Sequence, residues 1–298
     1  METPIADHLK THAAAIEGLR LAIGSSLPSY MDSLYLLRFC LSFPQEKERL
    51  EAVRKCIAWR EANAGMLADA AAGRGAPSEA AIRAFQVAGF HGKTRRGDSL
   101  FVVRSGLCDP IGMMKAVSHE EFVAWLMYYR EVGCLDCAAE TARRGYLCKQ
   151  VTLIDLKDSP ITTFDTRYFK GLGEASNVSE YVYPQLLRRS VIFNPPSFFS
   201  TVFAFIRPFM SAKSLEKTTL CPGRTAARPS FSACPFASAL FDGADLPTFL
   251  GGKCLCLAKG GCVSGRPNEQ CRPAPAGGPR EATIVVPARS VYDIHLAA

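Results

Sequence analysis

The stretch VIFNPPSFFSTVFAFIRPFM, residues 191–210, joins a short β-rich run to a helix that is apolar on nearly all sides. Pro196 is suited to begin this helix, because proline is favoured at the first helical position. Eight apolar side chains form two neighbouring faces at helical spacing: Phe198, Val202, Phe205 and Phe209 on one, and Phe199, Phe203, Ile206 and Met210 on the other. Such a helix either lies in a protein core or forms one wall of an apolar cavity. Periodicity alone favours the core and leaves the cavity open.

Other short apolar runs of β-forming residues alternate with helical stretches along the chain. These runs occupy residues 100–103, 151–154 and 191–193, with residues 218–221 as a further candidate. The longest helix between them is predicted to begin at a capping box of Ser118 and Glu121 and to end near Gly145. Continuous apolar runs indicate strands that are covered on both faces. They therefore predict an α/β fold with a helix-flanked, largely parallel mixed sheet.

The composition divides the chain into four regions: a helical amino-terminal lobe over residues 1–65, a linker with a short helix over 66–90, an α/β domain over 91–262, and a tail rich in Gly, Pro and Cys over 263–298. Helices in the first region are predicted over residues 7–23, 28–43 and 44–63. The linker lies at residues 68–77, and the short helix after it is predicted to reach about Ala88. Two final strands are predicted over residues 282–286 and 290–296.

The overall composition is that of a globular protein able to bury a large core. The 298 residues are 48% hydrophobic and 21% charged. No apolar run reaches the roughly 18 to 20 residues that a membrane-spanning helix needs, and the first nine residues lack the pattern of a secretory or transit peptide. We therefore expect a cytosolic protein whose 12 cysteines are reduced and mostly buried.

Most of the excess positive charge lies in one segment. The formal net charge is +7, and residues 183–241 carry seven basic side chains against the single acidic Glu216. This segment indicates either an anionic partner, such as a lipid headgroup or phosphate, or a solvated basic face. We expect no contact with nucleic acid.

Sequence motifs for catalysis are scarce. Ser214 and Lys217 match the S-x-x-K nucleophile motif of acyl enzymes, but the S-D-N and K-T-G elements that accompany it are absent. The G-x-S-x-G, G-x-x-x-x-G-K-[ST] and G-x-G-x-x-G motifs are absent too. We therefore expect no enzymatic activity, with serine acyl transfer through Ser214 and Lys217 as a remote alternative.

Four cysteines near the carboxyl end form a weak candidate metal site: Cys254, Cys256, Cys262 and Cys271. Thiolates close together in flexible backbone suit zinc. Their spacing fits no C-x-x-C pair, so the sequence alone favours no metal.

Several motifs, in order, resemble the CRAL-TRIO lipid-transfer family. They are the run Leu36-Leu37-Arg38-Phe39, the helix end Ala58-Trp59-Arg60, VTLIDLK at 151–157, Tyr183-Pro184-Gln185, Ile192 to Pro195, Phe198-Phe199-Ser200, Arg207-Pro208-Phe209, and Leu246-Pro247 with Leu250-Gly251-Gly252. Cys254, Cys256 and Cys262 also resemble the ending of this family. The ordered series extends from about Asp32 to Cys262 and is highly specific.

The resemblance implies a sheet that floors an apolar pocket for one lipid, closed by a mobile gate helix that begins at Pro196. The implied pocket and gate residues are Phe90, Phe101, Phe198, Phe199, Val202, Phe203, Phe205, Ile206 and Phe209. The resemblance also makes a cavity wall the favoured interpretation of that helix.

By this resemblance, the implied function is non-enzymatic binding and transfer of one membrane phospholipid, with phosphatidylinositol favoured. The protein would be a cytoplasmic monomer that visits membrane surfaces and needs no cofactor besides the bound lipid. Two alternatives stay open. One is a carrier or sensor of a neutral lipid of sterol, squalene or tocopherol type, and the other is presentation of lipid to a lipid kinase or trafficking partner.

Residues that would hold the headgroup are only partly kept. Ser214 and Lys217 match the Thr-x-x-Lys pair that binds phosphatidylinositol in the family, while Gln185 replaces the glutamate after Tyr-Pro. Residues 41–43 contain no basic side chain where the family has one.

The family's phosphatidylcholine site is also depleted, because Phe90 and Phe101 stand for tyrosines and Gln150 for a serine, leaving Thr152. A phosphoinositide held instead by Arg188, Arg189 or Arg207 is a further alternative. The final strand pair resembles the beginning of a GOLD domain.

Overall fold

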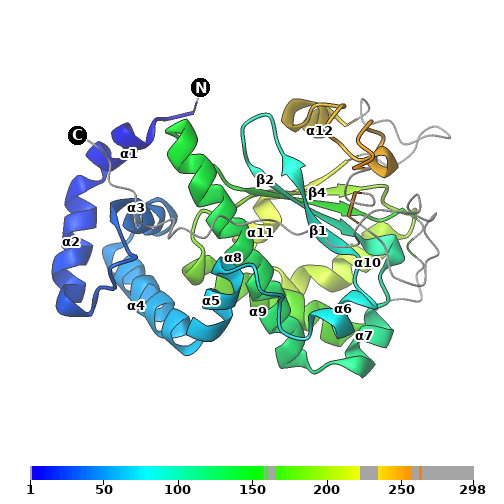
Figure 1. Cartoon of the computed structure of the whole chain (residues 1–298), viewed down its shortest axis with the longest axis horizontal. Coiled ribbons are helices and arrows are strands. Elements are labelled where there is room, and N and C mark those ends of the chain that lie inside the picture. Colours follow the sequence, from blue (N-terminus) through cyan, green and yellow to red (C-terminus); the bar gives the residue numbers. More distant parts are fainter. Residues whose placement is uncertain (1, 158, 160–164, 222–233, 257–261, 264–298) are drawn as a thin grey trace.

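The computed structural model describes residues 2–157, 159, 165–221, 234–256 and 262–263. A lobe of helices lies beside an α/β lobe built around one five-stranded sheet (Figure 1). The helical lobe contains α1 (Ile5–Thr11), α2 (Ala13–Ile23), α3 (Ser33–Ser42), α4 (Glu46–Ala62) and α5 (Ala64–Ala71). The helices of the α/β lobe are α6 (Glu79–Arg83), α7 (Pro110–Ala116), α8 (His119–Arg144), α9 (Thr166–Val182), α10 (Phe199–Ile206), α11 (Ala212–Glu216) and α12 (Pro235–Leu240).

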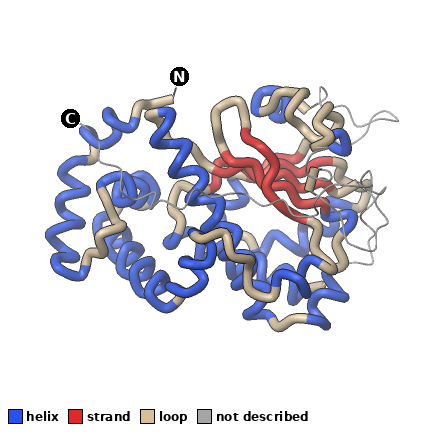
Figure 2. Tube along the Cα trace, in the orientation of Figure 1, coloured by secondary structure: helices blue, strands red, loops and turns tan. Residues whose placement is uncertain are grey.

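The sheet confirms the predicted α/β class and its largely parallel character. Its strands, in spatial order, are β1 (Ala88–Lys93), β2 (Ser99–Arg104), β3 (Gln150–Asp155), β4 (Leu187–Phe193) and β5 (Thr218–Leu220) (Figure 2). β1 runs antiparallel to β2, and β2 to β5 are mutually parallel neighbours. β1 was not predicted. Its run contains two glycines and a histidine and so shows no continuous apolar pattern, and pairing with β2 supplies its backbone hydrogen bonds.

Side chains alternate between two separate hydrophobic cores along each central strand. On β2, Leu100 and Val102 belong to one core, while Phe101 between them belongs to the other. The core on the side of Leu100 is completed by the carboxyl-terminal segment, through Cys234, Phe241, Leu246 and Leu250. The opposite core contains side chains of α8 and α9. Both faces of the sheet are therefore covered, as the continuous apolar runs predicted.

Helix α8 begins and ends where the sequence predicts. The Ser118 hydroxyl accepts a hydrogen bond from the Glu121 backbone N–H at 3.1 Å, and the Glu121 carboxylate accepts one from the Ser118 N–H at 2.8 Å. Gly145 ends the helix with a φ of +73°, which glycine adopts without strain. The capping box is confirmed.

Two local expectations need correction. The stretch at 68–77, predicted as a linker, is helical as far as Ala71, because α5 continues into it. Cys221 and Cys234 form a disulfide and are exceptions to the predicted reduced thiols, whereas Cys40, Cys56, Cys108, Cys134, Cys137 and Cys148 are free and buried. The predicted final strands at 282–286 and 290–296 lie outside the described residues.

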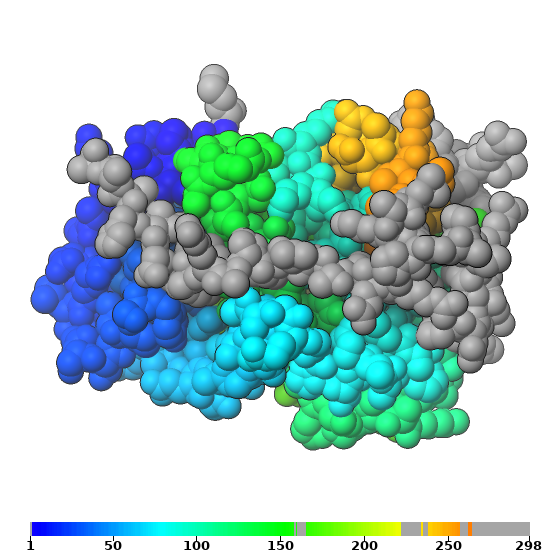
Figure 3. Space-filling model, in the orientation of Figure 1, coloured from blue at the N-terminus to red at the C-terminus, as the bar shows by residue number. Residues whose placement is uncertain are grey.

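The two lobes are joined by a buried ion pair between α4 and α8. The Arg60 guanidinium donates two hydrogen bonds of 3.0 Å to the Glu131 carboxylate, and the side chains are only 7% and 2% exposed. Arg60 also lies over the ring of Tyr30, 5.1 Å from its centroid. At the carboxyl end of α8, the Ile5 N–H donates a hydrogen bond of 2.9 Å to the Gly145 carbonyl. The dark blue amino-terminal helices accordingly abut the green α8 in the space-filling view (Figure 3).

We predict that Glu131→Gln lowers the free energy of unfolding by about 3 kcal/mol, because it leaves the Arg60 charge buried without its counter-charge. Chemical denaturation of the variant and the wild type measures this loss. Glu51→Gln is the matched control, since it removes the same charge from an exposed pair with Lys55 whose side chains are 59% and 57% exposed. Equal, small effects of the two substitutions would contradict the role given to the buried pair.

Candidate functional site: an apolar cavity with a polar end

A cavity of about 420 Å³ lies between one face of the sheet and helices α8, α9 and α10. Alternate residues of the central strands form its floor: Phe101 and Val103 of β2, Gln150, Thr152 and Ile154 of β3, and Ser190 and Ile192 of β4. The residues between them point into the core on the other face. The two-residue period of the strands therefore separates a packed face from a face that borders open space.

Helix α10 forms one wall of the cavity. The lining side chains on and around this helix are Phe198, Phe199, Val202, Phe203, Ile206, Phe209 and Met210. The rings of Phe199 and Phe203 stack, with centroids 5.4 Å apart. None of the residues of α10 is buried, so the interpretation from periodicity, a helix inside the core, is wrong. One side of the helix faces the cavity, whereas Ser200, Thr201 and Phe205 are exposed on the other.

Two of the predicted pocket residues lie outside the lining. Phe90, on the edge strand β1, lies beside Phe101, with ring centroids 5.0 Å apart. Phe205 points away from the cavity and is 64% exposed.

Polar side chains gather at one end of the cavity, where α11 and the start of β5 meet α9. Ser214 and Lys217 both line this end, as do Lys213 and Ser176. The Ser214 hydroxyl lies 2.9 Å from the Ser176 hydroxyl, and the Lys217 ammonium donates to the Leu187 carbonyl at 2.9 Å. Burial, together with the charge of Lys213, lowers the pKa of Lys217. The Ser214 hydroxyl also accepts a hydrogen bond from the Ser211 hydroxyl at 3.1 Å.

Gln185 connects this polar end to the helical lobe. Its amide donates to the Leu41 carbonyl at 3.1 Å and to the Ser42 hydroxyl at 3.0 Å, and its oxygen accepts from the Lys149 ammonium at 2.5 Å. Burial and the nearby charges of Arg188, Lys217 and Arg38 lower the pKa of Lys149 to about 8. These three cations and the Asp98 carboxylate therefore lie near the Lys149 side chain.

Arg130 is a cavity residue that the sequence analysis missed. It extends from α8 into the lining of the cavity. Burial lowers the pKa of Arg130 to about 10, so the side chain stays charged at neutral pH. Within the described part of the chain, no hydrogen bond or ion pair reaches its guanidinium. One signal was available in the sequence: a charge directly after the aromatic run Trp125 to Tyr129.

The three arginines considered for phosphate or membrane contact do not line the cavity. Arg188 pairs with Asp98 at 2.6 Å and with Glu2 at 3.3 Å. Arg189 donates to the Thr219 hydroxyl at 2.6 Å. Arg207 is exposed at the end of α10.

Three of the four candidate metal-binding cysteines come together elsewhere in the molecule. Cys254, Cys256 and Cys262 meet on the other side of the sheet from the cavity, beside His91 of β1, which sequence spacing gave no reason to include. Cys271 lies outside the described residues.

Among the described residues, no helix is both long enough and apolar enough to span a bilayer.

Comparison with known proteins identifies the architecture. The model of the CRAL/TRIO domain matches residues 85–252, which confirms the resemblance. The phosphatidylinositol/phosphatidylcholine transfer proteins SFH12 and SFH11 of Arabidopsis thaliana are 23% and 24% identical over 177 residues, or 59% of this chain. The Sec14 cytosolic factor of Schizosaccharomyces pombe is 24% identical over 259 residues, 85% of each chain.

The Arabidopsis relatives are longer proteins, and the match spans 31% of SFH12 and 45% of SFH11. Among solved structures, the crystal structure of Sfh5 has a TM-score of 0.48 and 13% identity, and the match covers 72% of this chain and 79% of that one.

We predict that Gly173→Ala loosens the turn after α10. A Cβ at position 173 of α9 would overlap the backbone oxygen of Phe209, and overpacking of this kind costs about 1 to 3 kcal/mol. The variant should take up a fluorescent apolar dye into the cavity about tenfold faster, as stopped-flow fluorescence can measure.

Gly18→Ala is the control, because a Cβ at that position of α2 meets nothing within 4 Å. Unchanged uptake by Gly173→Ala would show that the turn does not govern entry to the cavity.

Proposed function

Since this chain belongs to the CRAL/TRIO domain family, we propose that it binds one membrane lipid in the cavity and transfers it between membranes. The observation that carries this proposal is an apolar cavity with a single polar end, bounded by α10 on one side. The apolar lining suits acyl chains, and the polar end suits a headgroup. No covalent chemistry is needed.

Solvation determines how such a lipid exchanges. Two acyl chains contain roughly 30 methylenes, and at about 0.8 kcal/mol each their release into water costs about 24 kcal/mol. A barrier of that size permits only about 10⁻⁵ events per second. Exchange therefore takes place at a membrane surface, where one lipid replaces another while the chains stay out of water.

Helix α10 is suited to act as the gate at that surface. It carries Phe205, which is 64% exposed, and is followed by the exposed cation Arg207. An aromatic ring inserts among acyl chains, and a cation pairs with anionic headgroups. Membrane contact would draw α10 outward and open the cavity.

An anionic phospholipid of phosphatidylinositol type is the favoured cargo. Three of the four charged side chains in the lining are cations, namely Arg130, Lys213 and Lys217, and Glu180 is the fourth. The Ser214 hydroxyl and the Lys217 ammonium supply the donors that a phosphate requires. Arg130 on α8 adds a further cation to the lining, which a neutral lipid would leave unpaired.

We propose that the protein works in the cytoplasm, as a monomer that binds membranes peripherally. The name of the fission-yeast relative, a cytosolic factor, supports this placement. The basic end of the cavity would also suit presentation of the headgroup to a lipid kinase.

Lys217→Ala is predicted to slow the transfer of phosphatidylinositol between vesicles about tenfold, because it removes a charge-assisted hydrogen bond worth about 1.5 to 3 kcal/mol. A fluorescence-dequenching assay with labelled donor vesicles measures the rate. Lys10→Ala is the matched control, since Lys10 is an exposed residue of α1. Circular dichroism verifies that both variants fold.

Each other result has a definite meaning. Equal rates for Lys217→Ala and the wild type would place the headgroup elsewhere. Transfer of a sterol in preference to phosphatidylinositol would overturn the anionic cargo but keep lipid transfer. Lipid binding without transfer by the wild type would leave presentation or sensing as the function.

A further inference from the structure

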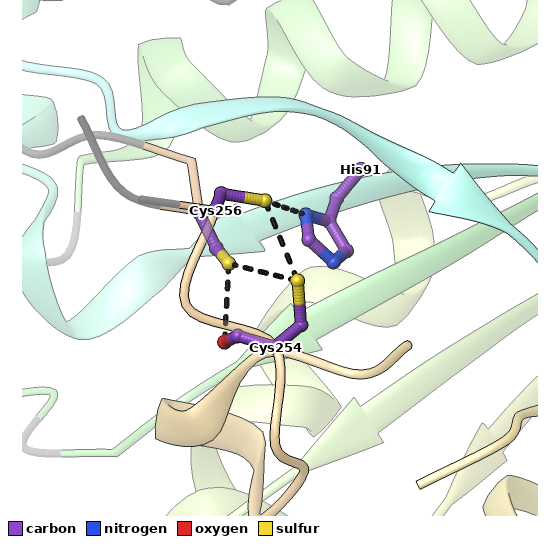
Figure 4. A group of neighbouring side chains, drawn as sticks. His91, Cys254 and Cys256 are labelled. Carbon is purple, nitrogen blue, oxygen red and sulfur yellow. Dashed lines mark hydrogen bonds between the residues drawn. The ribbon is translucent and has the colours of Figure 1, made fainter. Parts of the chain in front are cut away.

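On the side of the sheet away from the cavity, three cysteines and a histidine converge. His91 extends from the edge strand β1, and Cys254 and Cys256 come from the carboxyl-terminal segment that covers this face (Figure 4). Cys262 joins them from the end of the same segment. One ligand atom from each residue lies within 4.8 Å of every other. None of these side chains lines the lipid cavity.

The distances match those of a tetrahedral zinc site. Two sulfurs bound to one zinc ion at about 2.3 Å lie about 3.8 Å apart, and a bound sulfur and nitrogen lie about 3.6 Å apart. The Sγ atom of Cys254 is 3.4 Å from Sγ of Cys256 and 3.7 Å from Sγ of Cys262. Sγ of Cys256 is 3.7 Å from Nδ1 of His91.

The histidine is held in the tautomer that a metal requires. Its Nε2 atom lies 2.8 Å from the backbone carbonyl oxygen of Asp245. Because a carbonyl only accepts hydrogen bonds, Nε2 carries the proton and the lone pair of Nδ1 is directed at the cysteines. Metal-binding histidines are usually fixed through their second nitrogen in this way.

We propose that His91, Cys254, Cys256 and Cys262 bind one Zn²⁺ ion as a closed structural site. Three thiolates and one imidazole complete a tetrahedral shell of four protein ligands and leave no open position for catalysis. Thiolate ligands select zinc over magnesium or calcium, which prefer oxygen.

The ion would fasten the carboxyl-terminal segment to the sheet. This segment supplies Phe241, Leu246 and Leu250 to the core on the second face. Within the segment, the Cys254 N–H donates a hydrogen bond of 2.9 Å to the Leu246 carbonyl. A bond to His91 would anchor it on β1, the antiparallel edge strand. The zinc ion would thereby stabilise the sheet that floors the cavity from behind.

Metal analysis of the full chain tests this proposal. Protein purified under reducing conditions should contain about one zinc ion per chain, as measured by inductively coupled plasma mass spectrometry. Cobalt(II) should replace it and give the intense visible bands of a tetrahedral thiolate site. A strong chelator should lower the melting temperature, and added Zn²⁺, but not Mg²⁺, should restore it.

Variants locate the site. Cys256→Ser and His91→Ala should each weaken zinc binding at least tenfold. Removal of a group that only hydrogen-bonds to a metal ligand already lowers metal affinity by about that factor, and these substitutions remove a ligand itself. Cys40→Ser is the matched control, because Cys40 is a buried free thiol of α3 outside the cluster, and it should keep full zinc content. The cobalt spectrum and chelator response use the unaltered chain, so they decide the matter even where a variant fails to fold.

The proposal would be overturned by a chain that stays free of zinc after zinc is added, or by a cobalt complex with an octahedral spectrum. A Cys254–Cys256 disulfide in protein purified under reducing conditions would also overturn it. Zinc retained in full by both His91→Ala and Cys256→Ser would likewise place the ion elsewhere.

Discussion

One face of the sheet borders a cavity, and that constraint shapes the rest of the molecule. Apolar side chains such as Phe101 and Ile192 face open space there, so the structure needs a wall that is apolar on its inner side. Helix α10 provides this wall, since Phe199 and Phe203 line the cavity and none of the helix residues is buried. Protein interiors normally pack as densely as crystals of small organic molecules. An apolar ligand in the cavity would fill the space that the side chains leave empty.

Contacts between distant parts of the chain hold the surroundings of the cavity together. The Arg60–Glu131 pair fixes the helical lobe to α8, and Gln185 ties the polar end of the cavity to Leu41 and Ser42 of that lobe. On the far side, the carboxyl-terminal segment packs on the sheet, and the cluster around His91 lies where that segment meets β1. In the proposed transfer mechanism only α10 would have to open at a membrane, and neither the Arg60–Glu131 pair nor the Gln185 contacts involve a residue of α10.

Local signals predicted much of the fold, and contacts between distant residues account for what they missed. The Ser118–Glu121 capping box and the apolar runs of β2, β3 and β4 lie in continuous sequence and follow from propensity and spacing. β1 depends on its pairing with β2, and His91 lies 165 positions before Cys256, so no spacing rule could connect them. Arg130 illustrates the same limit within the site. Helical spacing predicts which residues lie on the same face of α8 as Arg130. Only the folded α/β lobe shows that this face borders the cavity.

Identification of the lipid that accompanies the protein is the most direct test of the central claim. The full chain is purified from cells without detergent, its mass is measured under native conditions, and bound lipid is extracted and identified by mass spectrometry. We expect one phospholipid per chain, with an anionic headgroup that can pair with Lys217 and Arg130. A chain that carries no lipid, and accepts none from vesicles, would contradict the claim that the cavity is a lipid site.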